Sequence, residues 1–132
     1  MTLQDMEFLR ENGVVGDCVR ACTATILGIP RSEVPHFVRD HDGDWRGPWE
    51  DFIEARGYIV LEIDPRRRPD CVYLGCGPTV RTTEYRPAGH MVVMDGRRVA
   101  HDPHPSRAGL TTLDRVYVLV PQRLCALPQE TP

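Results

Sequence analysis

The sequence of 132 residues contains no lysine, and its 16 basic residues are all arginine. Its formal net charge is -3, and the chain has no long block of basic residues. A broad basic surface is what binding to nucleic acid or to anionic lipid requires. The composition therefore favours neither a nucleic-acid partner nor a membrane partner.

Long apolar runs are also missing. The longest, Val116–Pro121, is far too short to cross a bilayer, and the charged N-terminus does not resemble a secretory signal. We therefore expect a protein made and kept in the cytoplasm of a cell. Because the 5 cysteines are an odd number in such a chain, we expect free thiols that serve packing, metal binding or catalysis.

No internal repeat or low-complexity tract divides the chain, and its hydrophobic content of 41% is enough for one core. We expect a single domain over residues 1–126. The remaining residues, 127–132, read LPQETP and predict a disordered tail.

The first half of the chain has helical patterns. Asp17 can cap a helix that begins at Cys18, runs for about three turns and stops at Gly28. A short helical turn is predicted within Ser32–Val38. A further helix is predicted from Pro48 to Gly57, because proline suits the first helical position and glycine ends a helix.

The second half contains short runs rich in β-branched and aromatic residues, which predict strands. These runs are Tyr58–Ile63, Cys71–Gly75, His90–Met94, Arg98–Asp102 and Val116–Val120. Helices followed by antiparallel strands indicate an α+β domain in which the helix of Cys18 packs on a twisted sheet.

Cys18 stands where an apolar run begins, directly after an acidic residue. A thiol attacks as its thiolate, and the positive end of a helix dipole stabilises that anion in the first turn. Free cysteine is also among the most buried residue types. Packing is therefore the alternative for Cys18 and the preferred interpretation for Cys22, Cys71, Cys76 and Cys125.

A nucleophilic cysteine needs a base, and the base needs a third group that holds its tautomer. His90 opens one predicted strand, Asp102 closes the next, and Asp95-Gly96 between them indicates a hairpin. A bulged register would place His90 opposite Asp102 and apolar residues opposite one another, so we predict it over a strict two-residue turn. The alternatives are a strand-end histidine satisfied by backbone and an ordinary Asp-Pro turn.

Three segments together resemble a known family: Asp17-Cys18-Val19-Arg20-Ala21-Cys22, His90-Met91-Val92-Val93 and Asp102-Pro103. They are similar to the DCG-x-AC, H-[FY]-V-V and DP segments of the papain-like cysteine peptidases that process bacteriocin leaders at double-glycine sites. The stretches GDCVRACTATILGIPRSEVPHF and GHMVVMDGRRVAHDPHPSRAGL look closer still to small uncharacterised phage and bacterial proteins of that fold. The resemblance covers Gly16–Leu110, most of the chain.

The resemblance implies a papain-like fold with Cys18 as nucleophile, His90 as general base and then acid, and Asp102 as the orienting group. It implies acyl transfer on a peptide or amide bond of a peptide or protein substrate, without a cofactor or metal. In the family a glycine follows the nucleophile, and here this residue is Val19. The family's upstream glutamine falls on Asn12.

Asn12 could donate the same hydrogen bond to an oxyanion, and Gln4 is the other nearby amide upstream. The backbone N–H of Cys18 would be the second donor. One such donor is worth about 2.7 to 4 kcal/mol of barrier. Three other residues are candidate substrate contacts: Trp45, Ser106 and Arg107.

Two further interpretations stay open. A papain-like domain without catalysis would serve as a phage or bacterial module that binds a peptide or host protein, and thiol reactivity separates it from an enzyme. A Cys2His2 zinc site would draw on four residues: Cys18, Cys22, His101 and His104. Metal analysis of protein purified without chelator tests the zinc site.

Overall fold

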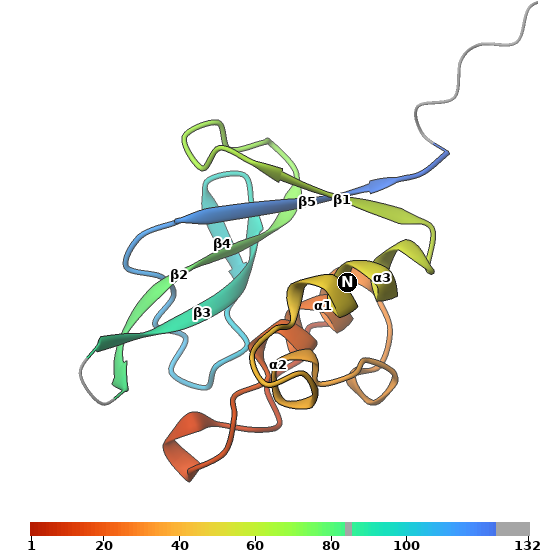
Figure 1. Cartoon of the computed structure of the whole chain (residues 1–132). Coiled ribbons are helices and arrows are strands. Elements are labelled where there is room, and N and C mark those ends of the chain that lie inside the picture. Colours follow the sequence, from red (N-terminus) through yellow and green to blue (C-terminus); the bar gives the residue numbers. More distant parts are fainter. Residues whose placement is uncertain (84–85, 124–132) are drawn as a thin grey trace, which may run out of the picture.

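The computed structural model describes residues 1–83 and 86–123, and these residues form an α+β fold (Figure 1). The elements are η1 (Arg10–Asn12), α1 (Cys18–Leu27), η2 (Arg31–Glu33), α2 (Phe37–Asp40), α3 (Arg46–Glu54), β1 (Tyr58–Ile63), β2 (Val72–Thr83), β3 (Arg86–Asp95), β4 (Arg98–His101) and β5 (Arg115–Pro121), where η marks a 3-10 helix. The predicted α+β class is confirmed. The predicted tail at 127–132 and Cys125 lie outside the described residues.

Helix α1 has the bounds that its apolar spacing predicts. Gly28 ends it with a φ of 68°, a left-handed conformation that favours glycine. The helix packs on β3 and β2, and the Cys22 thiol, fully buried, donates a hydrogen bond to the carbonyl oxygen of Met91, 3.3 Å away. This contact confirms that Cys22 is a packing residue and fixes α1 against β3.

The other helices differ in detail from the prediction. The predicted turn at Ser32–Val38 is split at Pro35 into η2 and α2, because proline supplies no backbone N–H to continue a helix. Helix α3 begins at Arg46, so Pro48 is its third residue and still lies in the first turn, where a missing N–H costs no helical hydrogen bond.

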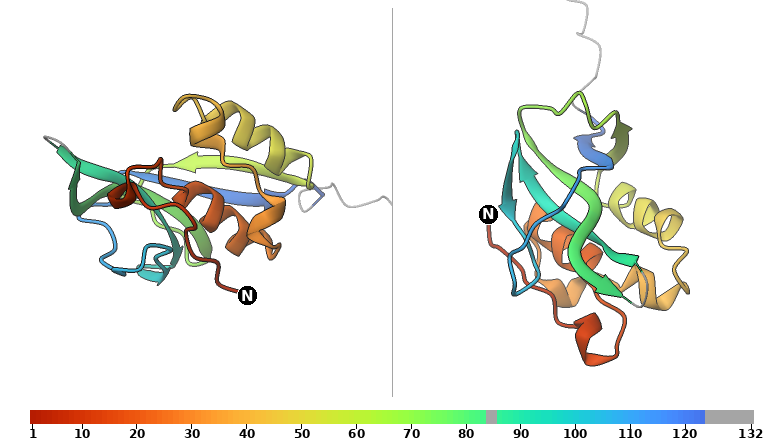
Figure 2. Two further views of the ribbon diagram at one scale, coloured as in Figure 1. Left: turned by 90° about the horizontal axis from the view of Figure 1, so that it is seen from below. Right: turned by 90° about the vertical axis from the view of Figure 1, so that its left-hand side faces the viewer.

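The strands of the described residues belong to one antiparallel sheet of five strands in the order β1-β5-β2-β3-β4. Figure 2 shows how strongly this sheet twists beside the helices. Strand β1 has the predicted bounds, whereas β2 continues far beyond the predicted end at Gly75. Gly77 sits inside β2, where the carbonyl oxygen of Thr112 occupies the space that a Cβ atom would need. This glycine therefore serves close backbone packing rather than chain reversal.

The predicted register of the β3–β4 hairpin is wrong. Asp95 pairs with Arg98, so the turn residues are Gly96 and Arg97. The bulge lies within β4, at Ala100, since Met94 pairs with Val99 but Val93 pairs with His101. The start of β2 and the residue before it fix the position of this turn. The Tyr73 hydroxyl donates to the Gly96 carbonyl at 2.6 Å, and the Gly96 N–H donates to the Cys71 carbonyl at 3.1 Å.

The main core lies between the helices and the sheet. Trp49 of α3 is fully buried, and its indole N–H donates to Thr23 Oγ1 of α1 at 2.9 Å. Its ring meets that of Tyr117 edge-on, with the centroids 5.3 Å apart. A smaller cluster on the other face of the sheet packs Tyr73 and Val92 under the loop of Leu110 and Leu113.

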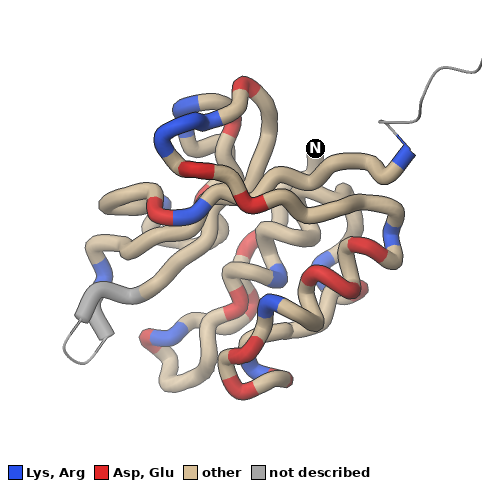
Figure 3. The backbone as a smooth tube through the Cα atoms, turned by 45° about the horizontal axis from the view of Figure 1, so that its top comes forward, with Lys and Arg blue, Asp and Glu red and all other residues tan. Residues whose placement is uncertain are grey.

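Acidic and basic residues are scattered over the described backbone (Figure 3). The Arg66–Arg68 run is exposed in the loop between β1 and β2, where Arg66 pairs with Asp64 at 2.7 Å. Cys71, expected to pack, is exposed beside this loop. None of the described helices has both the length and the apolar character needed to cross a membrane.

Candidate active site

Cys18 is the first residue of α1, and its side chain is half-buried. Asp17 occupies the N-cap position, as predicted, but its side chain makes no capping hydrogen bond to the helix. Instead, this buried carboxylate accepts the backbone N–H groups of Glu7 and Phe8, at 3.0 and 2.9 Å. The predicted cap is wrong in this respect, because the N-terminal segment needs the same acceptor.

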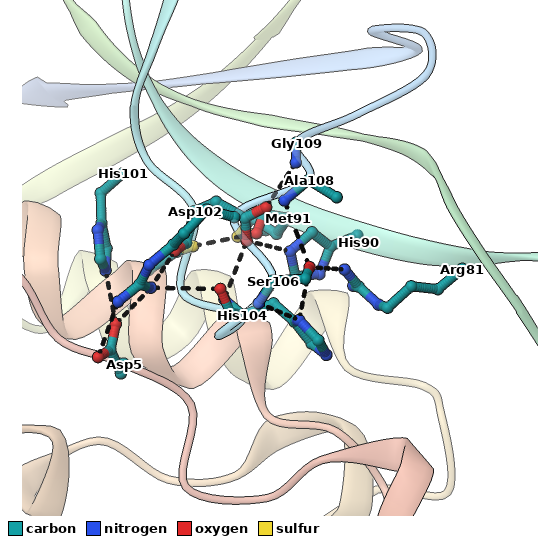
Figure 4. Close-up of polar contacts among 12 residues, drawn as sticks. Asp5, Arg81, His90, Met91, His101, Asp102, His104, Ser106, Ala108 and Gly109 are labelled. Carbon is teal, nitrogen blue, oxygen red and sulfur yellow. Dashed lines mark hydrogen bonds and ion pairs between the residues drawn. The ribbon is translucent and has the colours of Figure 1, made fainter.

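His90 and Asp102 form a hydrogen-bonded pair (Figure 4). His90 Nε2 lies 2.7 Å from Asp102 Oδ1, and each side chain is only 2% exposed. The predicted contact is therefore present, although the predicted strand register is not. Strand β4 ends at His101, and the turn that follows directs the Asp102 carboxylate to the ring.

Two backbone N–H groups hold the Asp102 carboxylate in place. His104 N–H donates to Oδ1 at 2.9 Å, and Gly109 N–H donates to Oδ2 at 2.7 Å. Because a carboxylate only accepts hydrogen bonds, Nε2 of His90 must carry the proton between the two side chains. The other ring nitrogen, Nδ1, is then the one that can exchange a proton with another group.

The pKa values of the pair move apart. Burial by itself lowers the pKa of His90, but the hydrogen bonds and charges of Asp102 and Cys18 outweigh it and raise the pKa to about 9. Burial raises the pKa of Asp102, whereas hydrogen bonds from His90, His104 and Gly109 and the His90 charge bring it to about 2. At neutral pH the pair is an imidazolium beside a carboxylate.

Cys18 and His90 line one open cleft of about 1190 Å³. Cys18 contributes to the raised pKa of His90, because its sulfur favours the charged ring by accepting a hydrogen bond from the imidazolium and by its negative charge as a thiolate. Trp45 also lines this cleft, beside Tyr117. A sulfur atom, an imidazole and a carboxylate are thus arranged in series at the wall of a cavity that is large enough for a ligand.

The structure brings some of the other predicted site residues to the cleft and leaves others outside. Asn12 is exposed at the end of η1 and does not line the cleft. The Gln4 backbone is tied to Thr25 Oγ1 and to His101, which keeps this residue away from the cleft as well. Neither side chain is placed to donate to an oxyanion near Cys18.

Ser106 and Arg107 lie in the loop behind Asp102 and do not line the cleft. The Arg107 guanidinium donates to the carboxylate of Asp5, at 2.7 and 3.1 Å, and to the Asp102 carbonyl. Arg107 adopts a φ of 51°, a costly backbone conformation for arginine. Its contacts are those of a residue that holds the Asp102 turn rather than of one that touches substrate.

The four residues of the zinc alternative do not converge. The Cys22 thiol is hydrogen-bonded to the Met91 carbonyl, and the His101 ring faces the Asp5 carboxylate and the Gln4 carbonyl. Within residues 1–83 and 86–123, no group of three or more Cys, His, Asp or Glu side chains is arranged to hold a metal ion.

The sequence did not predict a second polar network at the same cleft. The Ser106 backbone N–H donates to His104 Nδ1 at 3.0 Å, so the proton of the neutral ring is on Nε2, which donates to Glu11 Oε2 at 2.9 Å. Arg81 of β2 completes the network through the Ser106 hydroxyl, 3.1 Å away. The HDPH spacing marked His104 only as a possible metal ligand, and nothing in the sequence pointed to Arg81.

We compared the chain with protein-family models, with curated proteins and with solved structures, and none of the three comparisons gave a match.

Proposed function

We propose that the protein is a cysteine hydrolase of papain-like fold that cleaves a peptide or amide bond. One observation carries this proposal: an Asp102-bound imidazole with a raised pKa lines the same cleft as a helix-starting cysteine. Buried histidines that serve packing alone do not need both a carboxylate partner and an accessible thiol neighbour.

The chemistry follows from the roles of the three side chains. The Cys18 thiolate attacks the carbonyl carbon, a C–S bond forms, and the carbonyl electrons move onto oxygen. As the C–N bond breaks, His90 gives its Nδ1 proton to the leaving amine, and Asp102 holds the ring by Nε2. Water then attacks the thioester, His90 accepts a proton from it, and the thiolate leaves.

The start of α1 supports stabilisation of the oxyanion. Cys18 is the first residue of the helix, so its backbone N–H has no acceptor within the helix and is free to bind an oxyanion. The amides of Asn12 and Gln4 are not in the cleft, so a second donor would be another backbone N–H. The proposal therefore rests on a helix N-terminus rather than on an amide side chain.

The same absence of an amide donor favours a second candidate, a catalytically inactive papain-like module that binds a peptide or protein. Val19 in place of the family's glycine points the same way. The two candidates differ in one property, because only the hydrolase needs a reactive thiolate. We propose for either function a setting inside a bacterial or phage-infected cell, on the basis of the resemblance.

A labelling experiment tests the hydrolase. Peptide vinyl sulfone probes are incubated with the parent protein, Cys18→Ala, His90→Ala and the surface control Asp95→Asn, and the adducts are located by peptide mapping. We expect adducts at Cys18 in the parent and the control and none in Cys18→Ala or His90→Ala. A screen for peptide hydrolysis should show turnover that disappears in Cys18→Ala. Equal turnover by the parent and Cys18→Ala would overturn the proposal.

A further inference from the structure

Arg81 is a cation within the cleft that the triad does not use. It extends from β2, lines the cleft together with Cys18 and His90, and has a side chain that is only 18% exposed. Removing a guanidinium from water is costly unless its N–H groups find partners. Its position therefore raises the question of which group it binds.

Within the described residues, Arg81 has two side-chain partners, and both leave donors free. Nη1 donates to Ser106 Oγ at 3.1 Å, and Nε lies 3.9 Å from Glu11 Oε1 (Figure 4 shows the first contact). Ser106 Oγ is held in turn by the Ala108 N–H at 3.3 Å. Among the residues that the structure describes, a neutral oxygen orients the guanidinium, and the Glu11 carboxylate lies beyond hydrogen-bond distance.

Glu11 is a weak counter-ion for Arg81 because His104 binds it more closely. His104 Nε2 lies 2.9 Å from Glu11 Oε2, and the pKa of Glu11 is lowered chiefly by this hydrogen bond. The Glu11 side chain is half exposed, and its Oε1 lies 3.9 Å from Arg81 Nε, so an incoming anion has no hydrogen bond between Glu11 and Arg81 to break. Arg10, on the same 3-10 helix as Glu11, also lines the cleft and is exposed.

The lining of the cleft also has an apolar part. Trp45, Tyr117 and Val38 contribute aromatic and aliphatic surface to it. A substrate in the cleft would therefore meet both apolar side chains and an oriented guanidinium. A planar guanidinium with free N–H groups matches a carboxylate and can bind it through two parallel hydrogen bonds.

We propose that Arg81 recognises a carboxylate of the substrate, so that the hydrolase acts on an acidic peptide or amide. This inference rests on the proposed function of Cys18 and His90. The carboxylate could belong to an acidic side chain or to a free C-terminus, because both present the same two oxygens. On binding, it displaces Glu11 from Arg81 and leaves the Glu11–His104 contact intact.

Matched pairs of bromoacetyl peptides test the inference through the rate of Cys18 alkylation. One pair carries Asp or Asn after a glycine, with a C-terminal amide, and the other carries a free or amidated C-terminus. The ratio of the rates within a pair cancels any general change in thiol reactivity. We expect the parent to prefer the carboxylate of at least one pair by about three- to tenfold.

Variants locate the source of that preference. It should fall below about twofold in Arg81→Gln, and it should stay at the parent value in Arg98→Gln, which removes an equal charge from an exposed site on β4. Glu11→Gln should increase it by removing the competing carboxylate. Because Glu11→Gln leaves Arg81 in place, it still tests the inference if Arg81→Gln fails to fold.

The outcomes separate the two proposals. If Cys18 reacts with the neutral peptides but shows no preference for a carboxylate, or keeps its preference in Arg81→Gln, the role of Arg81 is overturned and the hydrolase stands. If Cys18 reacts with neither member of any pair, nor with iodoacetamide, both proposals fall.

Discussion

Replacing Asp102 by asparagine removes a charge and changes one acceptor oxygen into an NH2 group. The carboxylate accepts three N–H groups, from His90 at 2.7 Å, His104 at 2.9 Å and Gly109 at 2.7 Å. An amide offers a single acceptor oxygen, so in either orientation at least one of these donors faces another donor. If the NH2 group faces His90, the histidine must carry its proton on Nδ1, the nitrogen that should serve Cys18.

Two costs determine the size of the effect. A buried donor left without an acceptor costs about 1 to 3 kcal/mol. The raised pKa of His90, about 9 against an ordinary 6.5, corresponds to at most about 3 kcal/mol, which Asp102 shares with Cys18. We therefore expect Asp102→Asn to lose about 2 to 4 kcal/mol of unfolding free energy at pH 6.5.

Urea unfolding of the parent, Asp102→Asn and Asp95→Asn measures this loss. Asp95 is a suitable control because its ion pair with Arg98, at 3.3 Å, is on the surface and is worth less than about 0.5 kcal/mol. In the same samples, NMR of the ring nitrogens should show the pKa of His90 falling well below about 9 in Asp102→Asn, since Cys18 alone then opposes the effect of burial. Equal stability of the two variants, with an unchanged His90 titration, would refute the reasoning.

Three further predictions concern stability. Because the folded pKa of His90 lies above its unfolded value, the contribution of His90 to folding stability is complete below about pH 6.5 and is lost as the pH rises to about 9. The folded pKa of Asp102 lies below its unfolded value, so the contribution of Asp102 to stability is complete above about pH 4 and is lost as the pH falls toward 2. Urea midpoints should therefore fall between pH 6.5 and 9 in the parent but stay level in His90→Gln. Gly77→Ala should cost about 1 to 3 kcal/mol or more because of the Thr112 carbonyl, whereas Gly89→Ala, with open space around it, should be nearly neutral, and equal costs would contradict the account. Trp49→Phe should lose about 2 to 4 kcal/mol by calorimetry, because it leaves Thr23 without its donor and creates a cavity, and an unchanged melting temperature would count against this packing.

Some elements could be predicted because their own residues determine them. The helix of Cys18 ends where a glycine follows an apolar spacing of helical period, and β1 is a short run rich in β-branched and aromatic residues between Gly57 and Pro65. Pairing of His90 with Asp102 could also be anticipated, because a strand-opening histidine and an Asp-Pro turn flank one hairpin.

The hairpin register could not be predicted, because a third strand sets it. The Tyr73 hydroxyl donates to the Gly96 carbonyl, and the Cys71 carbonyl accepts the Gly96 N–H. These contacts place the turn one residue later than the Asp95-Gly96 pair suggests. Local turn propensities contain no information about such contacts. The same limit applies to Asp17, whose carboxylate binds the N-terminal segment rather than its own helix.

The polar network of Arg81 could not be predicted for a similar reason. Its members come from η1, β2 and the loop after β4, and no spacing along the chain relates Glu11 to Arg81 or to His104. Such networks form only when the fold brings distant segments together. A motif search finds the candidate pair of Cys18 and His90, but not a polar network that no motif describes.

The central claim is that His90 makes Cys18 a reactive thiolate, and the relative rates of alkylation at pH 6 test it most directly. Cys71 provides an internal reference, since it is exposed and its pKa is raised by burial and by the charges of Asp70 and Asp95. With limiting iodoacetamide and peptide mapping, we predict labelling of Cys18 at least about tenfold faster than of Cys71, and loss of that advantage in His90→Ala. Faster labelling of Cys71 in the parent, or an unchanged Cys18 rate in His90→Ala, would contradict the account.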